Sequence, residues 1–225
     1  MGINETIIDA IEARQSTRAY TSQDVASTDI EQILNSAARA PSGVNTQPWR
    51  VAVTRDSTKQ RISDALLAAR NSGSEPQPDY SYYPSEWKEP YRKRRVLCGK
   101  ALYSALGIAK SDKARQQQAW ENNYHFFGAP VGLFFFVDRG LNKGSWLDMG
   151  MFIQNVMLAA VGHGLATCPQ ASLADYPQTV RDILGIDEQY LLICGMALGY
   201  ADLSHPVNQY RLDREPQEQF TSWFD

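Results

Sequence analysis

A helical spacing of apolar residues, in which they recur every three or four positions, runs through three stretches of the chain. These stretches are residues 3–13, 28–38 and 59–69. The second begins with Thr28-x-x-Glu31, the pattern of a capping box, in which two side chains satisfy backbone N–H groups of the first turn. We therefore predict three amphipathic helices in the first third of the chain, the second of them starting at Thr28.

Strand patterns lie between and after these helices. Residues 49–54 alternate between apolar and polar side chains, which is typical of a strand with one buried face. Residues 129–137 and 190–198 are almost continuously apolar and predict buried strands. Residues 147–161 are helical in length and apolar on nearly every side. Such a helix must be buried, and a subunit interface is one place where it can be. Helices mixed with a few strands around one sheet predict the α/β or α+β class.

Residues 72–90 interrupt these regular patterns. Four prolines and four aromatic residues fall within this stretch, and long irregular segments of this kind are usually functional or disordered. The aromatic residues favour a loop with packing partners, so we predict a lid-like excursion around residues 72–100. A basic run at residues 92–95 follows the loop. A solvated helix face is the simpler explanation of that run, and a ligand site is the alternative.

The composition is that of an ordinary globular protein. Apolar residues make up 43% of the 225 residues, which argues against disorder. The 22 Lys and Arg residues against 25 Asp and Glu residues leave a formal charge of −3, whereas nucleic-acid binding normally needs a cationic excess, so we expect no such partner. Three cysteines without a C-x-x-C spacing predict no metal site. No stretch has the pattern of a signal or membrane segment, so we expect a soluble, cytoplasmic protein.

The usual signatures of side-chain catalysis are missing from the sequence. It has no G-x-S-x-G elbow, no phosphate-binding G-x-x-x-x-G-K-[ST] loop and no G-x-G-x-x-G fingerprint after a strand. Its three histidines stand in no metal-ligand spacing. We infer from these absences that a cofactor performs the reaction.

Two polar stretches are the best candidates for binding. Arg14-Gln15-Ser16-Thr17-Arg18 brings two guanidinium groups and two hydroxyls together, which suits a phosphate dianion. Cations that complement the dipole of the preceding helix are the alternative explanation. Residues 40–49 are rich in amides and hydroxyls and contain two prolines. That loop fits the edge of a flat heterocycle, or simply a connection between a helix and a strand.

In this order, the two stretches resemble the nitroreductase superfamily of FMN enzymes. Arg14-x-Ser16-x-Arg18 is followed about two dozen residues later by Ala40-Pro41-Ser42-Gly43-x-Asn45-x-Gln47-Pro48-Trp49. Three further stretches agree, namely Asp148-Met149-Gly150 with Gln154-Asn155, Gly164-Leu165-Ala166-Thr167-Cys168-Pro169, and Arg214-Glu215-Pro216. The resemblance covers nearly the whole chain and is weakest over residues 72–125.

The resemblance implies a single nitroreductase-like FMN-binding domain over residues 1–225. It also implies an α+β fold with a mainly antiparallel central sheet flanked by helices, and an intertwined homodimer with two flavins at its interface. By the family pattern, Arg14 and Ser16 hold the phosphate and ribityl chain, Arg18 reaches the N1/O2 edge of the flavin ring, and Arg214 completes the phosphate site. The implied cofactor contacts are Arg14, Gln15, Ser16, Thr17, Arg18, Cys168, Pro169, Gln170, Ala171, Arg214 and, as a weaker candidate, Arg211, with Pro41, Ser42, Gly43 and Asn45 contacting the flavin from the other subunit.

Residues 168–172 are expected beside N5 of the flavin. Many family members have Pro-x-Glu-Gly here, whereas this chain has Ala171 and Ser172 in place of Glu and Gly. The resemblance therefore implies a backbone N–H contact without assigning it to one residue. Cys168 stands where the iodotyrosine deiodinase branch has a threonine, and Ser16 stands where the branch that fragments FMN usually has an acid. Both departures argue against those two branches.

The activity implied is hydride transfer from NAD(P)H by way of FMN to an electron-poor acceptor, a nitroaromatic compound or a quinone, in a ping-pong mechanism. Reduction of another substrate class on the same fold (an enal, a diketone or a halophenol) is one alternative, and a non-enzymatic flavin-binding protein is another. A flat acceptor suits the aromatic side chains of the lid, and a carboxylate on that acceptor suits the basic run. We therefore predict Tyr82, Trp87 and Arg92 as substrate contacts.

Overall fold

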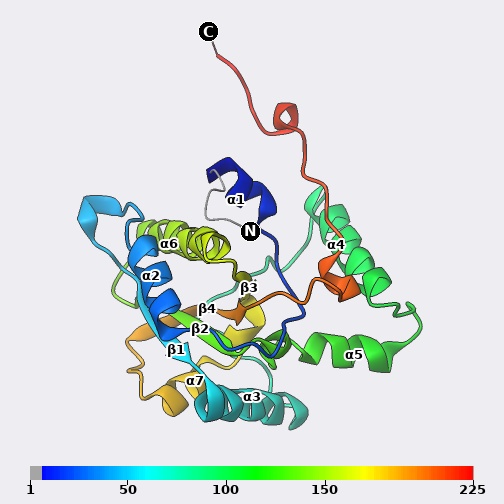
Figure 1. Ribbon diagram of the computed structural model, residues 1–225, viewed down its shortest axis with the longest axis horizontal. Helices are drawn as coiled ribbons and strands as arrows, with labels where there is room; N and C mark the ends of the chain where they lie inside the picture. The colour runs from blue at the N-terminus through cyan, green and yellow to red at the C-terminus, as the bar shows by residue number, and fades with distance from the viewer. Residues whose placement is uncertain (1–6, 225) are drawn as a thin grey trace.

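The computed structural model describes residues 7–224, and its helices surround a four-stranded sheet (Figure 1). Of the helix predicted over residues 3–13, the first four residues lie outside the described range. The α-helices are α1 (Ile7–Ala13), α2 (Ser27–Ala37), α3 (Asp56–Asn71), α4 (Tyr91–Ala105), α5 (Lys113–Glu121), α6 (Lys143–Gly162) and α7 (Pro177–Leu184). The strands are β1 (Arg50–Thr54), β2 (Val131–Asp138), β3 (Ala166–Gln170) and β4 (Tyr190–Gly199), and the short 3-10 helices are η1 (Gly43–Asn45), η2 (Phe126–Gly128), η3 (Ala171–Ala174), η4 (Pro206–Asn208) and η5 (Gln217–Gln219).

The sheet has the strand order β1-β2-β4-β3, and each neighbouring pair is antiparallel. The predicted α+β fold with a mainly antiparallel sheet is therefore confirmed. The strands predicted over residues 49–54, 129–137 and 190–198 are β1, β2 and β4. The sequence pattern does not predict β3, because this short strand contains Pro169, which cannot donate to a ladder and is tolerated at the edge of a sheet.

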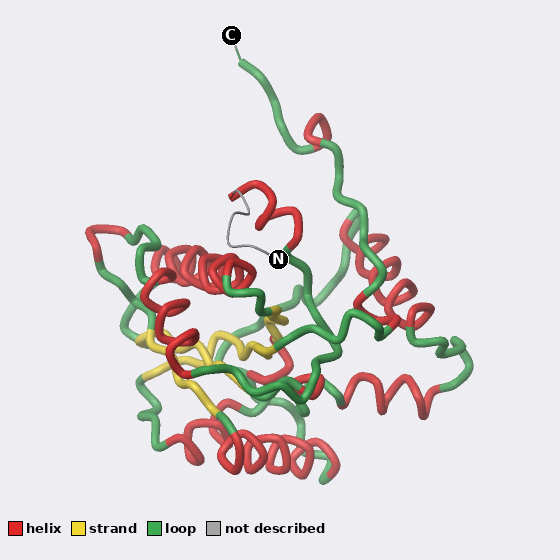
Figure 2. The backbone as a smooth tube through the Cα atoms, in the orientation of Figure 1, coloured by secondary structure: helices red, strands yellow, loops and turns green. Residues whose placement is uncertain are grey.

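The two faces of the sheet carry separate apolar cores, because successive side chains of a strand point to opposite faces. Along β2, Leu133, Phe135 and Val137 pack in the cluster that includes α2 and α6, whereas Phe134 and Phe136 pack in the cluster that includes α3 and α7. Figure 2 shows these helices as layers on either side of the strands. Burial on both faces explains why the sequence of this strand is apolar without alternation.

Helix α2 begins earlier than the capping box predicts, with its N-cap two residues before Thr28. Its N-cap position is Ala26, and no side chain caps it. Thr28 lies inside the first turn, where its hydroxyl does not serve as an N-cap, so the predicted capping box is wrong. Helix α5 is not predicted from the pattern, because most of its residues are polar and follow no apolar period.

Helix α6 is longer than predicted and only partly enclosed. Met149, Phe152 and Val156 are buried in the core cluster against the sheet. Leu147 and Met151 are exposed, so one protomer leaves part of this apolar helix uncovered. Within residues 7–224, each helix is too short or too polar to cross a bilayer.

Candidate active site

Polar segments from the two ends of the chain meet beside the edge strand β3. Ser16 forms an isolated parallel bridge with Thr167, and the Thr17 N–H donates to the Thr167 carbonyl at 3.0 Å. Asn208 holds the same segment from its other side, because its Oδ1 accepts the Arg18 N–H at 2.9 Å. The Asn208 carbonyl also accepts a hydrogen bond from Nε2 of residue 15 at 2.9 Å. The motif at residues 14–18 is thereby fixed next to the C-terminal segment.

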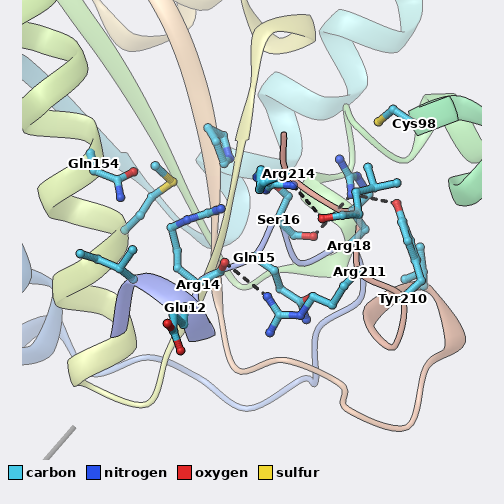
Figure 3. Close-up of a pocket in the computed structure, with 15 residues that line it drawn as sticks. Glu12, Arg14, Gln15, Ser16, Arg18, Cys98, Gln154, Tyr210, Arg211 and Arg214 are labelled. Carbon is cyan, nitrogen blue, oxygen red and sulfur yellow. Dashed lines mark hydrogen bonds between the residues drawn. The ribbon is translucent and has the colours of Figure 1, made fainter. Parts of the chain in front are cut away.

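Four arginines converge on a cavity of about 950 Å³ at this junction (Figure 3). Arg14 and Arg18 come from the segment after α1, whereas Arg211 and Arg214 come from the C-terminal segment, and Ser16 lines the same cavity. Arg211 Nη2 donates to the carbonyl of residue 13 at 3.0 Å, which ties the two segments together. Within residues 7–224, none of these guanidinium groups forms an ion pair with a carboxylate.

Among the described residues that line this cavity, Glu12 is the one carboxylic acid against four arginines, so the cavity keeps an excess of positive charge. Burial lowers the pKa of Arg14 from its ordinary value, and the nearby Arg214 and Arg211 guanidinium groups lower that pKa further. A bound anion relieves such mutual repulsion, and planar guanidinium groups suit phosphate oxygens in particular. The donor set of arginines and the Ser16 hydroxyl fits a cofactor that carries a phosphate group.

A second cavity of about 460 Å³ adjoins the first, and Arg18 and Pro169 line both of them. One wall is aromatic and includes Tyr80, Tyr82 and Tyr83 from the loop after α3. Another part of the lining comes from β3 and η3, which continue the chain past Pro169. The aromatic part of this lining suits a flat ligand, since aromatic faces stack on planar rings.

The base of the aromatic loop is fastened to the body of the protein. The Tyr80 hydroxyl donates to the Ile193 carbonyl at 2.7 Å, and its ring packs edge-on against Trp146 with the centroids 4.6 Å apart. Beyond this anchor, Tyr82 and Tyr83 are exposed and contact each other with ring centroids 4.7 Å apart. The loop is thus anchored at Tyr80 and exposed to solvent at Tyr82 and Tyr83. Its role as a lid stays a prediction.

Several predicted contacts belong to these cavities, although their side chains are partly occupied elsewhere. Gln15 lines the first cavity while its amide bonds Asn208. Cys168, Gln170 and Ala171 line the second cavity. Burial raises the pKa of the Cys168 thiol, and Gln170 Nε2 donates to the carbonyl of residue 123 at 2.7 Å. The backbone contact expected from residues 168–172 stays a prediction.

Other predicted residues lie away from both cavities of the protomer. Thr17 is buried and lines neither cavity, and its backbone N–H bonds to Thr167 of β3. Residues Pro41, Ser42, Gly43 and Asn45 lie around η1, in the light-blue loop at the left edge of Figure 1, where the Gly43 N–H donates to Asp148 Oδ2 at 3.3 Å. These residues line neither cavity of their own protomer. Their contact with the flavin of a second subunit therefore stays a prediction.

Two of the predicted substrate contacts lie beyond the second cavity. Trp87 packs against Tyr83 with ring centroids 5.6 Å apart, and the Arg95 guanidinium lies 5.2 Å from the centroid of the Trp87 indole ring. Arg92 forms an exposed ion pair with Glu89 at 3.6 Å. Neither Trp87 nor Arg92 lines the second cavity, so Tyr82 is the predicted substrate contact that belongs to it.

Residues without a sequence signal also line the two cavities. Tyr210 lies in the first cavity, where its hydroxyl is 3.4 Å from Arg18 Nη1. Asp175 and Asn123 lie in the second cavity. None of the three belongs to a motif, and each reaches its cavity through the packing of segments that are distant in sequence.

Known proteins share this fold and its sequence pattern. The sequence model of the Nitroreductase family matches residues 11–200. A 4-nitrobenzoate reductase from Pseudomonas putida is 40% identical over 212 residues, which are 94% of this chain and 92% of that protein. A nitrobenzene nitroreductase from Ectopseudomonas oleovorans is 37% identical and covers 96% of each chain. The chain belongs to the Nitroreductase family, and the predicted resemblance is confirmed.

Solved structures extend the likeness to the whole fold. The FMN and NADPH-dependent nitroreductase NfnB from Sphigopyxis sp. strain HMH superimposes with a TM-score of 0.96 at 40% identity, over 98% of this chain and 100% of that one. The FMN-dependent nitroreductase NfnB from Mycobacterium smegmatis, solved in complex with NADPH, gives a TM-score of 0.91 at 33% identity, over 96% of each chain. The predicted nitroreductase-like fold is therefore confirmed.

Proposed function

We propose that this member of the family is an FMN-dependent oxidoreductase that uses NAD(P)H to reduce nitroaromatic compounds or quinones. The observation that carries the proposal is the cluster of Arg14, Arg18, Arg211 and Arg214 around one cavity, next to a second cavity with an aromatic wall. The first cavity offers cations to a phosphate, and the second offers ring faces to a planar substrate. The relatives named above support both assignments.

Arg14, Ser16 and Arg214 are the residues that would hold the phosphate group and ribityl chain of FMN. Arg18 lines both cavities, so its cation is available where the phosphate-binding cavity meets the substrate cavity. A cation fixed in advance favours negative charge that develops beside it, without any reorganisation of the site. Bound FMN would supply the chemistry itself, by accepting hydride from a reduced nicotinamide dinucleotide and passing hydride to the acceptor. In this proposal the dinucleotide and the acceptor use the second cavity in turn, and such alternate binding gives a ping-pong order.

The homodimer is part of the same proposal. Large apolar side chains are exposed on α1, on α6 and on the C-terminal segment, and exposed patches of this kind usually mark an interface. The C-terminal segment leaves the body of the protomer near α4, to which the Arg94–Glu215 ion pair at 2.9 Å ties it (Figure 1). A second copy would cover these side chains and bring its 41–45 loop to the flavin. The exposed residues are Ile7, Ile8, Ile11, Leu147, Met151, Phe220, Trp223 and Phe224.

The experiment that tests the proposal is anaerobic titration of the purified protein. We expect flavin absorbance, bleaching of that absorbance by NADPH or NADH, and its return when nitrobenzene or a quinone is added. Parallel lines in double-reciprocal plots would accompany a ping-pong order, and a particle mass near twice 25.2 kDa would accompany the dimer. Protein that binds no flavin contradicts the proposal. Flavin that neither dinucleotide bleaches favours a non-enzymatic flavin-binding protein, and an enal, diketone or halophenol as the sole acceptor favours the other reductions of this fold.

The basic run after the loop gives a separate prediction about substrate charge. If Arg92 pairs with a carboxylate of the acceptor, Arg92→Ala will raise the KM for 4-nitrobenzoate and leave the KM for nitrobenzene unchanged. An exposed ion pair contributes about 0.2–1 kcal/mol, so the expected increase is about 1.5- to 5-fold. Lys93→Ala, at the neighbouring exposed position of α4, is the control. Equal KM changes for the two substrates would remove Arg92 from the substrate site.

A further inference from the structure

Asp175 is the one carboxylic acid among the described residues that line the second cavity, and no histidine lines it in that range. It follows η3 and leads into α7, and its side chain is half-buried. The Tyr124 hydroxyl donates to Asp175 Oδ2 at 3.0 Å. Over residues 7–224, Asp175 Oδ1 has no hydrogen-bond partner and the carboxyl has no ion pair. A carboxyl group with one neutral hydrogen-bond donor and no charged partner among the described residues therefore lines the cavity in which we place the substrate.

Asp79 provides a comparison within the same chain. Its buried carboxylate lies 2.6 Å from Arg181 Nη1 and 3.4 Å from Arg139 Nη2, and Oδ2 also accepts the Leu192 N–H at 2.8 Å. A carboxylate that loses water normally needs partners of this kind. Asp175 has one neutral hydroxyl donor instead of two arginines and a backbone N–H. Its ionised carboxylate is therefore stabilised far less than the carboxylate of Asp79.

The groups around Asp175 explain its protonation. Burial raises the pKa of the Asp175 carboxyl, while the Tyr124 hydrogen bond and the positive charge of Arg70 on α3 act in the opposite direction. Tyr83 from the 72–90 loop and Tyr176, the next residue along the chain, are the other ionisable groups that interact with it. The carboxyl consequently keeps its proton to a higher pH than an exposed aspartate does.

The remaining acids of this cavity are weaker than Asp175. Burial raises the pKa of Tyr80 and of Tyr83 from the ordinary value of 10.0. Burial also raises the pKa of the Cys168 thiol from 9.0. Such groups release a proton slowly near neutral pH, whereas an acid serves best when its pKa lies near the working pH. Of the acids compared, the Asp175 carboxyl is the one with an ordinary pKa below neutrality.

Reduction of a nitro group needs a proton for every hydride. The hydride from the reduced dinucleotide supplies one hydrogen nucleus together with two electrons, and one added proton provides the second hydrogen of the water that leaves. One N–O bond then breaks and its oxygen leaves as water, which converts a nitro group into a nitroso group. Atoms and charge balance once this proton is supplied, and an acid beside the acceptor oxygen can supply it within the site.

We propose that Asp175 is the general acid of the second cavity, donating its proton to an acceptor oxygen after hydride transfer and recovering a proton from solvent. The proposal rests on the proposed function, since the second cavity must hold the acceptor. Tyr124 is the positioning residue, because its hydroxyl donates to Oδ2 and leaves Oδ1 without a hydrogen-bond partner among the described residues. A carboxyl placed in this way contributes about 10²- to 10⁴-fold to a rate-limiting proton transfer.

The test follows reoxidation of the reduced holoenzyme by nitrobenzene, a substrate with no titrating group of its own, as a function of pH. In the wild type, the reoxidation rate should fall as the pH rises through the pKa of Asp175, because only the protonated carboxyl donates. Asp175→Asn should remove this fall of the rate with pH, which is the descending limb of the pH profile. It should also slow reoxidation by about 10²-fold or more at low pH. Reduction by NADPH should be unchanged, since that step needs no acid in this cavity.

Tyr124→Phe distinguishes a catalytic carboxyl from a structural one. The ring of Tyr124 is fully buried and packs edge-on with Trp120 at 5.2 Å, so the substitution keeps the packing and removes only the hydroxyl. Because the hydrogen bond lowers the pKa of Asp175, its loss should shift the pH limb upwards. Asp175→Glu should retain a limb. Asp182→Asn, an exposed carboxylate on α7 outside the cavity, is the matched control and should change neither half-reaction.

A measurement independent of turnover completes the test. Difference infrared spectra of wild type against Asp175→Asn, in protein without substrate, should show a protonated carboxyl band that persists above the pH expected of an exposed aspartate. A wild type that reoxidises with nitrobenzene and has the same pH profile as Asp175→Asn and Tyr124→Phe overturns this proposal and leaves the proposed function intact. A wild type that nitrobenzene and quinones fail to reoxidise overturns the proposed function itself.

Discussion

Replacement of Arg14 by alanine tests the electrostatic basis of the cofactor cavity. Burial and the charges of Arg214 and Arg211 lower the pKa of Arg14, so its cation is held at a cost in the protein without cofactor. Arg14→Ala removes that repulsion, and the free energy of unfolding of the apoprotein should stay the same or rise. The phosphate of FMN loses one charged hydrogen-bond donor, which is worth about 1.5–3 kcal/mol. The Kd for FMN should therefore rise about 10- to 150-fold.

Two measurements check this expectation. Fluorescence titration of the apoprotein gives the Kd for FMN, and thermal unfolding with and without saturating FMN gives the stabilisation that binding provides. The difference in Tm between the two samples should shrink by about 3–12 °C in the variant, since 1 kcal/mol corresponds to about 2–4 °C in a chain of this size. Arg14→Lys keeps the positive charge but lacks the planar guanidinium group. Its Kd for FMN should therefore lie between those of the wild type and Arg14→Ala. Arg61→Ala, an exposed arginine of α3 outside both cavities, is the control.

The reasoning is refuted if Arg14→Ala binds FMN within twofold of the wild type while the apoprotein remains folded. It is also refuted if the apoprotein loses several kcal/mol of stability, because Arg14 would then be a structural residue whose cation the fold requires. Loss of FMN affinity in Arg61→Ala as well would indicate a nonspecific effect of net charge.

Two further predictions concern stability and thiol chemistry. Asp79→Asn leaves Arg181 buried without its carboxylate, so unfolding in denaturant should show a loss of about 3–5 kcal/mol, and an unchanged midpoint would contradict the assigned pair. Cys98 is exposed, whereas Cys168 and Cys194 are buried and burial raises the pKa of Cys194 to about 12. A thiol reagent at pH 8 should therefore label Cys98 rapidly and label the other two only on unfolding, which mass spectrometry of the peptides would decide.

Local sequence patterns were sufficient to predict the strands in which burial follows a regular pattern along the chain. The continuous apolar runs of β2 and β4 and the alternation of β1 reflect which faces of each strand are buried, so the strands can be predicted from the chain itself. The arginine and serine chemistry of residues 14–18 likewise requires only residue types and spacing. Together with residues 40–49, this motif was enough to predict the family, which the matched range of residues 11–200 confirms.

Local patterns failed where tertiary contacts replace them. The capping box at Thr28 has the right residues, and yet the N-cap of α2 lies two residues earlier, at Ala26, so the Thr28 hydroxyl has no capping role. Strand β3 depends on pairing with β4, which begins 24 residues after it begins, and its own sequence carries little strand signal. Pairing partners of this kind contribute hydrogen bonds that no window of neighbouring residues contains.

The sequence by itself determined the family, the class of fold and the residues suited to a phosphate, because these depend on composition and spacing along the chain. The family resemblance predicted that Arg14 and Arg214 share one site, and the structure has both in the lining of one cavity, whereas only the tertiary structure decided that Asp175 lines the neighbouring one. Both results come from hydrogen bonds such as Arg18 to Asn208 and Tyr124 to Asp175, which join segments up to 190 positions apart. The burial and charge that tune these side chains arise from that packing, and so they are properties of the folded chain.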